Sequence, residues 1–169
     1  MAEQTEKIWV TPPLPGGVKI RHVGYLDLTE FYVWLQRWFE FQAFFKDDRD
    51  FEVFYEQRIL PKGEEMHIRW KGVKQENEYF TYVIEVIWLL VGINKVEVPM
   101  GDKKRKIHQG DFELRIGAYI VKKGPANFLR KIYEYFIMRK VIEDHKYKLY
   151  DKFYSLHDEI KSYFDQYVQ

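Results

Sequence analysis

Cysteine is absent from the 169-residue sequence, and serine occurs at only two positions, Ser155 and Ser162. The lack of cysteine excludes disulfides, thiolate metal sites and cysteine nucleophiles. Neither serine stands in a nucleophile-elbow context, and the glycine patterns of phosphate-binding and dinucleotide-binding loops are missing. These absences disfavour the common kinds of enzyme site, and we expect a non-catalytic protein without a cofactor.

The sequence also lacks an excess of charge of one sign. Its net charge is +1, from 27 basic and 26 acidic side chains, which argues against a dedicated nucleic-acid binder. Charged residues make up 31% of the chain, and abundant Lys and Glu are typical of proteins from hot environments. The first ten residues do not resemble a signal peptide, so we expect a cytoplasmic protein without a membrane partner.

Aromatic residues, at 18% of the chain, are plentiful, and the richest apolar stretch is residues 79–92, YFTYVIEVIWLLVG. Every even-numbered residue from Phe80 to Leu90 is apolar or aromatic, whereas Thr81 and Glu85 interrupt the odd-numbered set. The run is too short to cross a bilayer as a helix, which needs about 20 residues. The pattern predicts a central strand with one face buried and the other partly covered.

The remaining chain alternates between strand and helix patterns. Asp27, followed by Glu30 three residues later, predicts a capped helix over residues 28–45, nearly apolar around its circumference. Residues 46–50 read as a loop, and the stretch 125–169 repeats apolar residues at three- and four-residue steps, which predicts one long helix. Period-two alternation predicts strands at residues 18–26, 51–59, 66–71, 79–92, 96–98, 103–108 and 112–120. The turns predicted between them include residues 100–102 and 109–111.

This order predicts one α+β domain over residues 18–169, preceded by an extended, proline-containing leader or edge extension at 1–17. We expect an antiparallel meander of about five or six strands, covered on one face by the N-terminal and long C-terminal helices. In element order it resembles the helix-grip arrangement of START-like proteins, in which a long last helix lies across a curved antiparallel sheet. The second helix usual after the first strand of that arrangement is not predicted here, and no site residue is carried over.

Two clusters are candidate sites. On the polar side of the sheet, Glu85 is a lone carboxylate in an apolar strand, for which we expect a cross-sheet ion pair rather than a role as general base. Its candidate partners are Arg69, Lys71 and Arg115, although mixed charges at alternate positions also suit an ordinary wet sheet face. The polar sheet-face cluster so defined consists of His67, Arg69, Glu85 and Arg115.

The second candidate is a basic patch, which would form a phosphate-binding stripe if its members converged. The alternative is a basic hairpin edge that resists edge-to-edge association. Its members are Lys103, Lys104, Arg105, Lys106, Lys122, Lys123, Arg130 and Lys131.

Five histidines show no metal-ligand spacing, and we expect them to be scattered over the surface without a metal.

The C-terminal helix carries an aromatic stripe, Phe153, Phe164 and Tyr167, that packs on the first helix or on a partner such as a second copy of the chain. We therefore favour an interaction protein that engages a macromolecule through the basic hairpin and the aromatic C-terminal helix. The alternatives are a carrier of an apolar small molecule held between sheet and helix, a nucleic-acid-associated protein, and an enzyme acting through Glu85.

Overall fold

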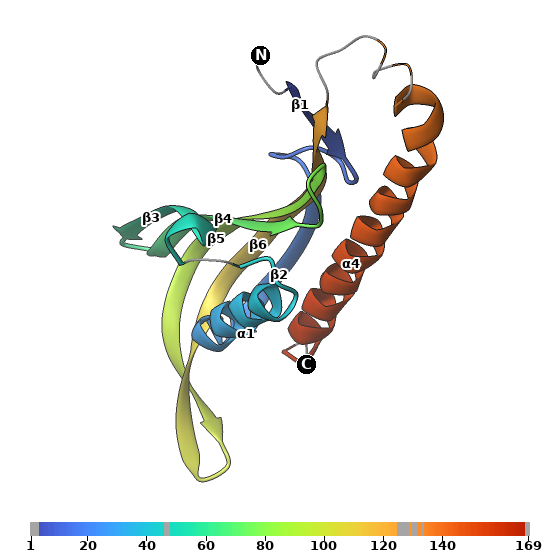
Figure 1. Ribbon diagram of the computed structural model, residues 1–169. Helices are drawn as coiled ribbons and strands as arrows, with labels where there is room; N and C mark the ends of the chain where they lie inside the picture. The colour runs from blue at the N-terminus through green and yellow to red at the C-terminus, as the bar shows by residue number, and fades with distance from the viewer. Residues whose placement is uncertain (1–3, 46–47, 125–128, 130–131, 133, 168–169) are drawn as a thin grey trace.

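A computed structural model describes residues 4–45, 48–124, 129, 132 and 134–167 of the chain. It has the predicted α+β class: a curved antiparallel sheet covered on one face by an N-terminal helix and a long C-terminal helix (Figure 1). The strands are β1 (Gln4–Trp9), β2 (Val18–Leu26), β3 (Glu52–Leu60), β4 (Gly63–Gln75), β5 (Phe80–Met100) and β6 (Lys103–Gly124). The helices are α1 (Leu28–Phe41), the one-turn α2 (Asp48–Phe51), the π-helical turn η1 (Glu134–Met138) and α4 (Arg139–Asp165).

Strand β5 lies between β4 and β6, in the sheet order β1-β6-β5-β4-β3, and is the central strand that the sequence predicted. Its even-numbered residues from Phe80 to Leu90 are at most 2% exposed and face the helices. On the other face Val83 and Ile87 are buried, Glu85 is half-buried and Val91 is exposed. We call the helix-covered face the front and the other the back.

Strand β6 pairs with three strands. Along one side it pairs with β5, and along the other it pairs with β2 and then with β1, placed end to end. The leader segment therefore includes an edge strand, and the connection from β1 to β2 crosses the back of β6. That crossing is close, because a Cβ on Gly117 would lie 2.8 Å from Leu14 Cγ. A side chain at position 117 would hold this connection off the sheet.

Helix α1 begins as predicted and ends one turn early. The Asp27 carboxylate accepts a hydrogen bond from the Glu30 amide at 3.1 Å, which caps the helix. The helix ends at Phe41 instead of residue 45, and Ala43 adopts a positive φ of 61°. This turn carries Phe44 into the core, and the Phe44 carbonyl accepts a hydrogen bond from the amide of Val73 on β4. Burial of one ring thus decides where the helix stops.

The loop predicted at residues 46–50 is only partly described, and its described part differs from the prediction. Residues 48–51 form α2, so the following strand begins at Glu52 rather than at Phe51. Phe51 is 4% exposed and packs on the rings of Phe45 and Trp70. The helical turn places Phe51 in the core. The predicted alternation would instead have made Phe51 the first residue of the edge strand.

The predicted turn at residues 109–111 is absent. Strands β5 and β6 continue past it as one long hairpin, with a register irregularity between Val91 and Asn94. A Cβ on Gly110 would lie 2.6 Å from the Ile93 side chain, so this glycine permits close contact with the neighbouring strand and does not mark a turn. The result is a two-stranded ribbon, residues 94–109, that projects beyond the rest of the sheet (Figure 1). We call it the arm.

Helix α4 runs unbroken from Arg139 to Asp165, which confirms one helix over that part of the predicted stretch 125–169. Residues 134–138 form the π-helical turn η1 instead, and 125–128, 130, 131, 133, 168 and 169 lie outside the described residues. Its buried side chains face the front of the sheet and α1, where Phe164 packs against Phe31 with ring centroids 4.9 Å apart. Gly72 on β4 allows α1 to approach the sheet, because a Cβ there would lie 2.6 Å from the Phe39 ring. Rings therefore fill the space between sheet and helices.

Candidate binding sites

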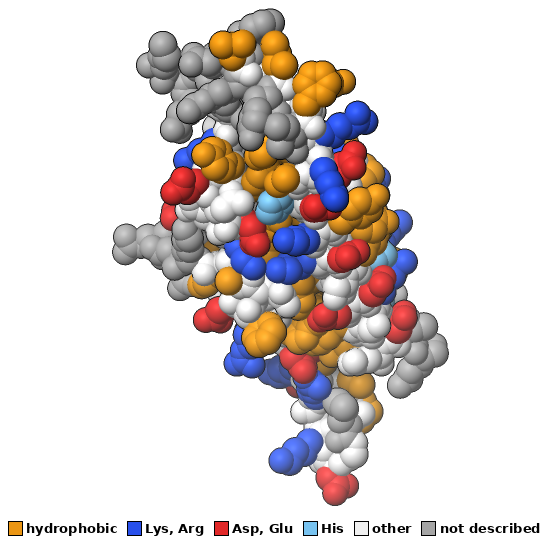
Figure 2. All heavy atoms as spheres, turned by 45° about the vertical axis from the view of Figure 1, so that its right-hand side comes forward, with side chains coloured by type: hydrophobic (Ala, Val, Ile, Leu, Met, Phe, Trp, Pro, Cys, Tyr) orange, Lys and Arg blue, Asp and Glu red, His pale blue; other side chains and the backbone are white. Residues whose placement is uncertain are grey.

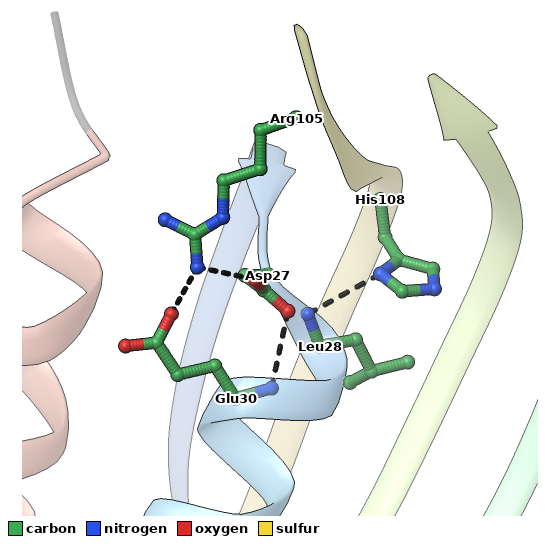
Figure 3. A network of polar contacts seen from close by, with 5 residues as sticks. All are labelled: Asp27, Leu28, Glu30, Arg105 and His108. Atoms are coloured by element: carbon green, nitrogen blue, oxygen red, sulfur yellow. Dashed lines mark hydrogen bonds and ion pairs between the residues drawn. The ribbon is translucent and has the colours of Figure 1, made fainter. Parts of the chain in front are cut away.

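A small polar network fixes one face of the arm to the start of α1 (Figure 3). The guanidinium of Arg105, from β6, donates to the carboxylates of both Asp27 and Glu30. His108 Nδ1 accepts a hydrogen bond from the Leu28 amide at 3.3 Å. Hydrogen bonds donated to the two carboxylates raise the pKa of Arg105, whereas burial lowers the pKa of His108. The network holds the arm in one position relative to the helix.

Away from this network the arm is basic and exposed. Lys103, Lys104 and Lys106 all lie open to solvent, and Lys106 is paired across the ribbon with Glu97. Lys104 and Lys106 share one face of the ribbon because strand side chains alternate, while Arg105 turns to the other face and reaches α1. Of the four basic residues predicted as a patch here, three remain available to a partner.

The other predicted members of the basic patch do not join this surface. Lys122 and Lys123 lie near the opposite end of β6, separated from Lys106 by about 50 Å of extended strand. Lys122 is buried, at 9% exposure. Arg130 and Lys131 lie outside the described residues. The patch predicted from the sequence is therefore not a single stripe, because strand length carries its parts to different ends of the molecule.

The polar sheet-face cluster lies on the back of the sheet. Its residues come from three neighbouring strands, with Arg69 and Arg115 flanking Ile87 in one cross-strand row. Glu85, one row away, accepts a hydrogen bond from the Tyr119 hydroxyl at 3.0 Å and makes no ion pair with a described residue. Arg115 donates to Glu113 at 2.8 Å instead. The expected ion pair of Glu85 is thus replaced by a tyrosine, since the candidate cations face other acceptors or solvent.

Part of this cluster lines a groove of about 340 Å³. The groove lies where the β1–β2 connection crosses the back of the sheet, and its walls are both polar and apolar. Lys7, Arg69 and Glu85 are the charged residues on it, and the Lys7 ammonium sits over the Tyr119 ring at 4.6 Å from its centroid. Burial, and then the neighbouring Glu85 carboxylate, raise the pKa of Tyr119. The apolar residues that line it are Trp9, Leu14, Pro15, Val53 and Ile87, together with Val86 and Trp70, whose side chains are buried in the core of the front face.

His67, the fourth member of the cluster, lies outside this groove. It lines a second hollow, of about 250 Å³, with Glu56, Arg58 and neighbouring residues of β4 and β5. Burial and the nearby Arg69 charge lower the pKa of His67. The four residues lie on one sheet face, but the structure divides them between two hollows and an arginine–glutamate pair.

Two histidines expected at the surface are buried. His22 donates from Nε2 to the Tyr25 carbonyl at 2.7 Å and stacks on Phe164. His145, 9% exposed, hydrogen-bonds the Tyr82 hydroxyl through Nδ1 and stacks on Phe80 with ring centroids 4.4 Å apart. Burial, followed by the charge of Lys148, lowers the pKa of His145. The signal for His145 was present in the sequence, since it stands four residues before Leu149 on the buried stripe of α4.

The aromatic stripe predicted for a partner is used inside the molecule. Phe153 and Phe164 are at most 4% exposed, and Tyr167 packs against the core. Exposed apolar side chains gather instead around the start of α4. They include Tyr135, Phe136, Val141, Tyr147 and Tyr150. On the face of the molecule where α4 comes forward, acidic and basic side chains are interspersed (Figure 2).

The part of the chain that the structure describes contains no group of three or more His, Asp or Glu side chains placed to hold a metal ion. Among its helices, none combines the length and the apolar character required to cross a bilayer. No family model, curated protein or solved structure matches the chain. The assignment of function therefore depends on the surfaces themselves.

Proposed function

We propose that the protein is a non-catalytic, cytoplasmic binding protein whose arm engages an acidic protein partner. The observation that carries this proposal is the arm itself: a ribbon attached to α1 through Arg105 and His108, projecting from the body, with Lys103, Lys104 and Lys106 exposed. A preformed ribbon loses little conformational freedom on binding, which favours affinity. Exposed lysines favour an approaching acidic surface and raise the association rate.

A protein partner fits the arm better than nucleic acid does. The arm carries no aromatic side chain on which a base would stack, and Glu97 and Asp102 offset part of its positive charge. The remaining basic residues of β6 lie at the far end of the strand, so they do not extend the arm's charge along a phosphate backbone.

The arm also supports the proposal better than the C-terminal helix does. The exposed aromatic side chains around the start of α4 lie at the opposite end of the molecule from the arm (Figure 1). One compact partner would have to span the whole protein to contact both surfaces. We therefore assign the partner contact to the arm and give the exposed aromatic residues no role in it.

The test compares two triple variants in affinity capture from the source cell, quantified by mass spectrometry after nuclease treatment. We expect Lys103→Ser/Lys104→Ser/Lys106→Ser to lose partners that the wild-type protein retains. The matched control, Lys19→Ser/Lys140→Ser/Lys161→Ser, removes three exposed lysines outside the arm and should retain them. Capture unchanged by the arm variant, or abolished by nuclease, would count against the proposal, provided that both variants show wild-type circular dichroism.

A second candidate function, binding of a small amphipathic anion, is supported by the groove on the back of the sheet. Its volume is at the lower end of the range for small-molecule sites, and its walls combine apolar side chains with two cations, Lys7 and Arg69, and one carboxylate, Glu85. The sequence also suggested a cavity for an apolar ligand between the sheet and the helices. No observation supports that cavity, because aromatic rings occupy the space. The pair Trp70 and Trp88, for example, has centroids 4.8 Å apart there.

The probe for this second function is anilinonaphthalene sulfonate, an aromatic anion whose fluorescence rises in apolar sites. We expect saturable binding. Arg69→Gln should raise the dissociation constant about tenfold, which corresponds to a loss of roughly 1.4 kcal/mol of binding free energy. Arg21→Gln is the matched control, since Arg21 is an exposed arginine of the same sheet outside the groove. Equal binding by both variants would exclude the groove as the anion site.

A further inference from the structure

Strand β3 ends the sheet with an unusually apolar surface. Among the described strands it pairs only with β4, so the backbone groups on its other side have no strand neighbour. Ile59 is 80% exposed and Tyr55 is 52% exposed, although both belong to a regular strand. Val53, Phe54 and Leu60 are also exposed.

The usual protections of an edge strand are weak in β3. Lysine and proline are absent from its nine residues, and its register irregularity lies at the start, between Glu52 and Phe54. From Tyr55 to Leu60 the strand pairs regularly with β4. Such an edge is a template for pairing with another strand. Most of its charge comes from Glu56 and Arg58, which form an ion pair at 2.7 Å within the chain.

These two charges make the strand complementary to itself. If two β3 strands pair antiparallel with Gln57 opposite its own copy, Glu56 of each chain faces Arg58 of the other. Because alternate side chains share a face, Phe54 and Leu60 lie opposite each other beside these charges. On the other face Tyr55 lies opposite Ile59. One register thus joins opposite charges on one face and buries the exposed apolar side chains on both.

We propose that a second copy of this chain covers β3, through antiparallel β3–β3 pairing with Gln57 on a twofold axis. The contact is isologous, so it closes after two copies and joins the two six-stranded sheets into one. It leaves the arm free and rests on different residues from those proposed for partner binding.

Sedimentation analysis of the full chain over a range of concentrations tests the pairing. We expect the wild-type protein to be a dimer and Arg58→Glu to raise its dissociation constant at least tenfold, because Glu56 then faces a glutamate. Glu56→Arg alone should weaken the dimer similarly. The exchange Glu56→Arg/Arg58→Glu should restore it, and an equimolar mixture of the two single variants should form a mixed dimer.

Two controls connect these outcomes to β3. Arg21→Glu reverses an exposed charge at the other edge of the sheet and should leave the dimer intact. The arm variant Lys103→Ser/Lys104→Ser/Lys106→Ser should also remain dimeric, which separates this inference from the proposed function. A wild-type monomer at all concentrations, a dimer that survives Arg58→Glu, or single variants that fail to form the mixed dimer would each overturn the proposal. Purification with a different protein bound at β3 would overturn it as well.

Discussion

The two faces of the sheet are made by the same strands, but they differ in how deeply their side chains are buried and therefore in which substitutions they tolerate. On the front, Trp88 and its even-numbered neighbours are sealed under α1 and α4. On the back, the polar Glu85 and the apolar Ile87 and Leu89 border open hollows. Adjacent residues of β5 thus differ in their surroundings: the front set is packed in the core, and the back set borders a partly open surface.

The largest expected effect is on the front face. Trp88→Ala should lower the free energy of unfolding by about 3–5 kcal/mol, because a fully buried ring is replaced by a cavity. Leu89→Ala, one residue away on the half-buried back, is the matched control and should cost distinctly less. Urea denaturation measures both. Equal losses would remove the distinction between the faces.

A smaller loss is expected from overpacking the same face. Gly72→Ala should destabilise the protein by about 1–3 kcal/mol, since its new methyl group would meet the Phe39 ring at 2.6 Å. Gly16→Ala has only the Pro13 carbonyl oxygen within contact distance, at 3.4 Å, and should be nearly neutral. A neutral Gly72→Ala would mean that α1 shifts easily on the sheet. Thermal unfolding of the two variants is the measurement.

Acidification should weaken the front face through His145. Because burial lowers its folded-state pKa, the unfolded chain binds a proton first as the pH falls below about 6.5, and stability declines until the folded-state pKa is reached. Lowered pKa values of His67 and His108 act in the same direction. His145→Phe should lower stability at pH 8, by leaving the Tyr82 hydroxyl without its partner, and should reduce the loss between pH 7 and pH 5. An unchanged pH dependence would contradict this role.

Where the arm is attached to α1, the expected loss of stability is smaller again. Arg105→Ala should cost about 1 kcal/mol or less, because the arginine is partly exposed and Asp27 still caps α1. Its clearer effect should be faster amide hydrogen exchange in residues 94–109, since the arm loses its attachment to α1. Lys104→Ala, on the other face of the ribbon, should leave exchange unchanged. Equal exchange in both variants would show that the ribbon is held by its backbone pairing alone.

The smallest effect is expected on the back. Glu85→Gln should change the unfolding free energy by less than about 0.5 kcal/mol, because an amide oxygen can still accept from the Tyr119 hydroxyl. Denaturation at neutral pH is again the measurement. A loss above 2 kcal/mol would show that the carboxylate charge itself is structurally required.

Periodicity predicted the central strand, the capped start of α1 and the unbroken C-terminal helix, because each depends on local pattern and burial. It failed where one residue type serves two physical needs. Gly110 signalled a turn but allows close packing against Ile93, and His145 suggested a surface residue but fills a core position. The groove on the back was beyond prediction, because it depends on where the β1–β2 connection crosses β6.

The pairing of β6 determines the order in which the sheet can be completed. Strands β1 and β2 belong to the first 26 residues, yet the strand that receives them begins at Lys103. During synthesis on the ribosome, the opening segment must remain unpaired until most of the polypeptide has emerged. Closing so long a loop is entropically slow, which makes docking of the N-terminal strands a late event in folding.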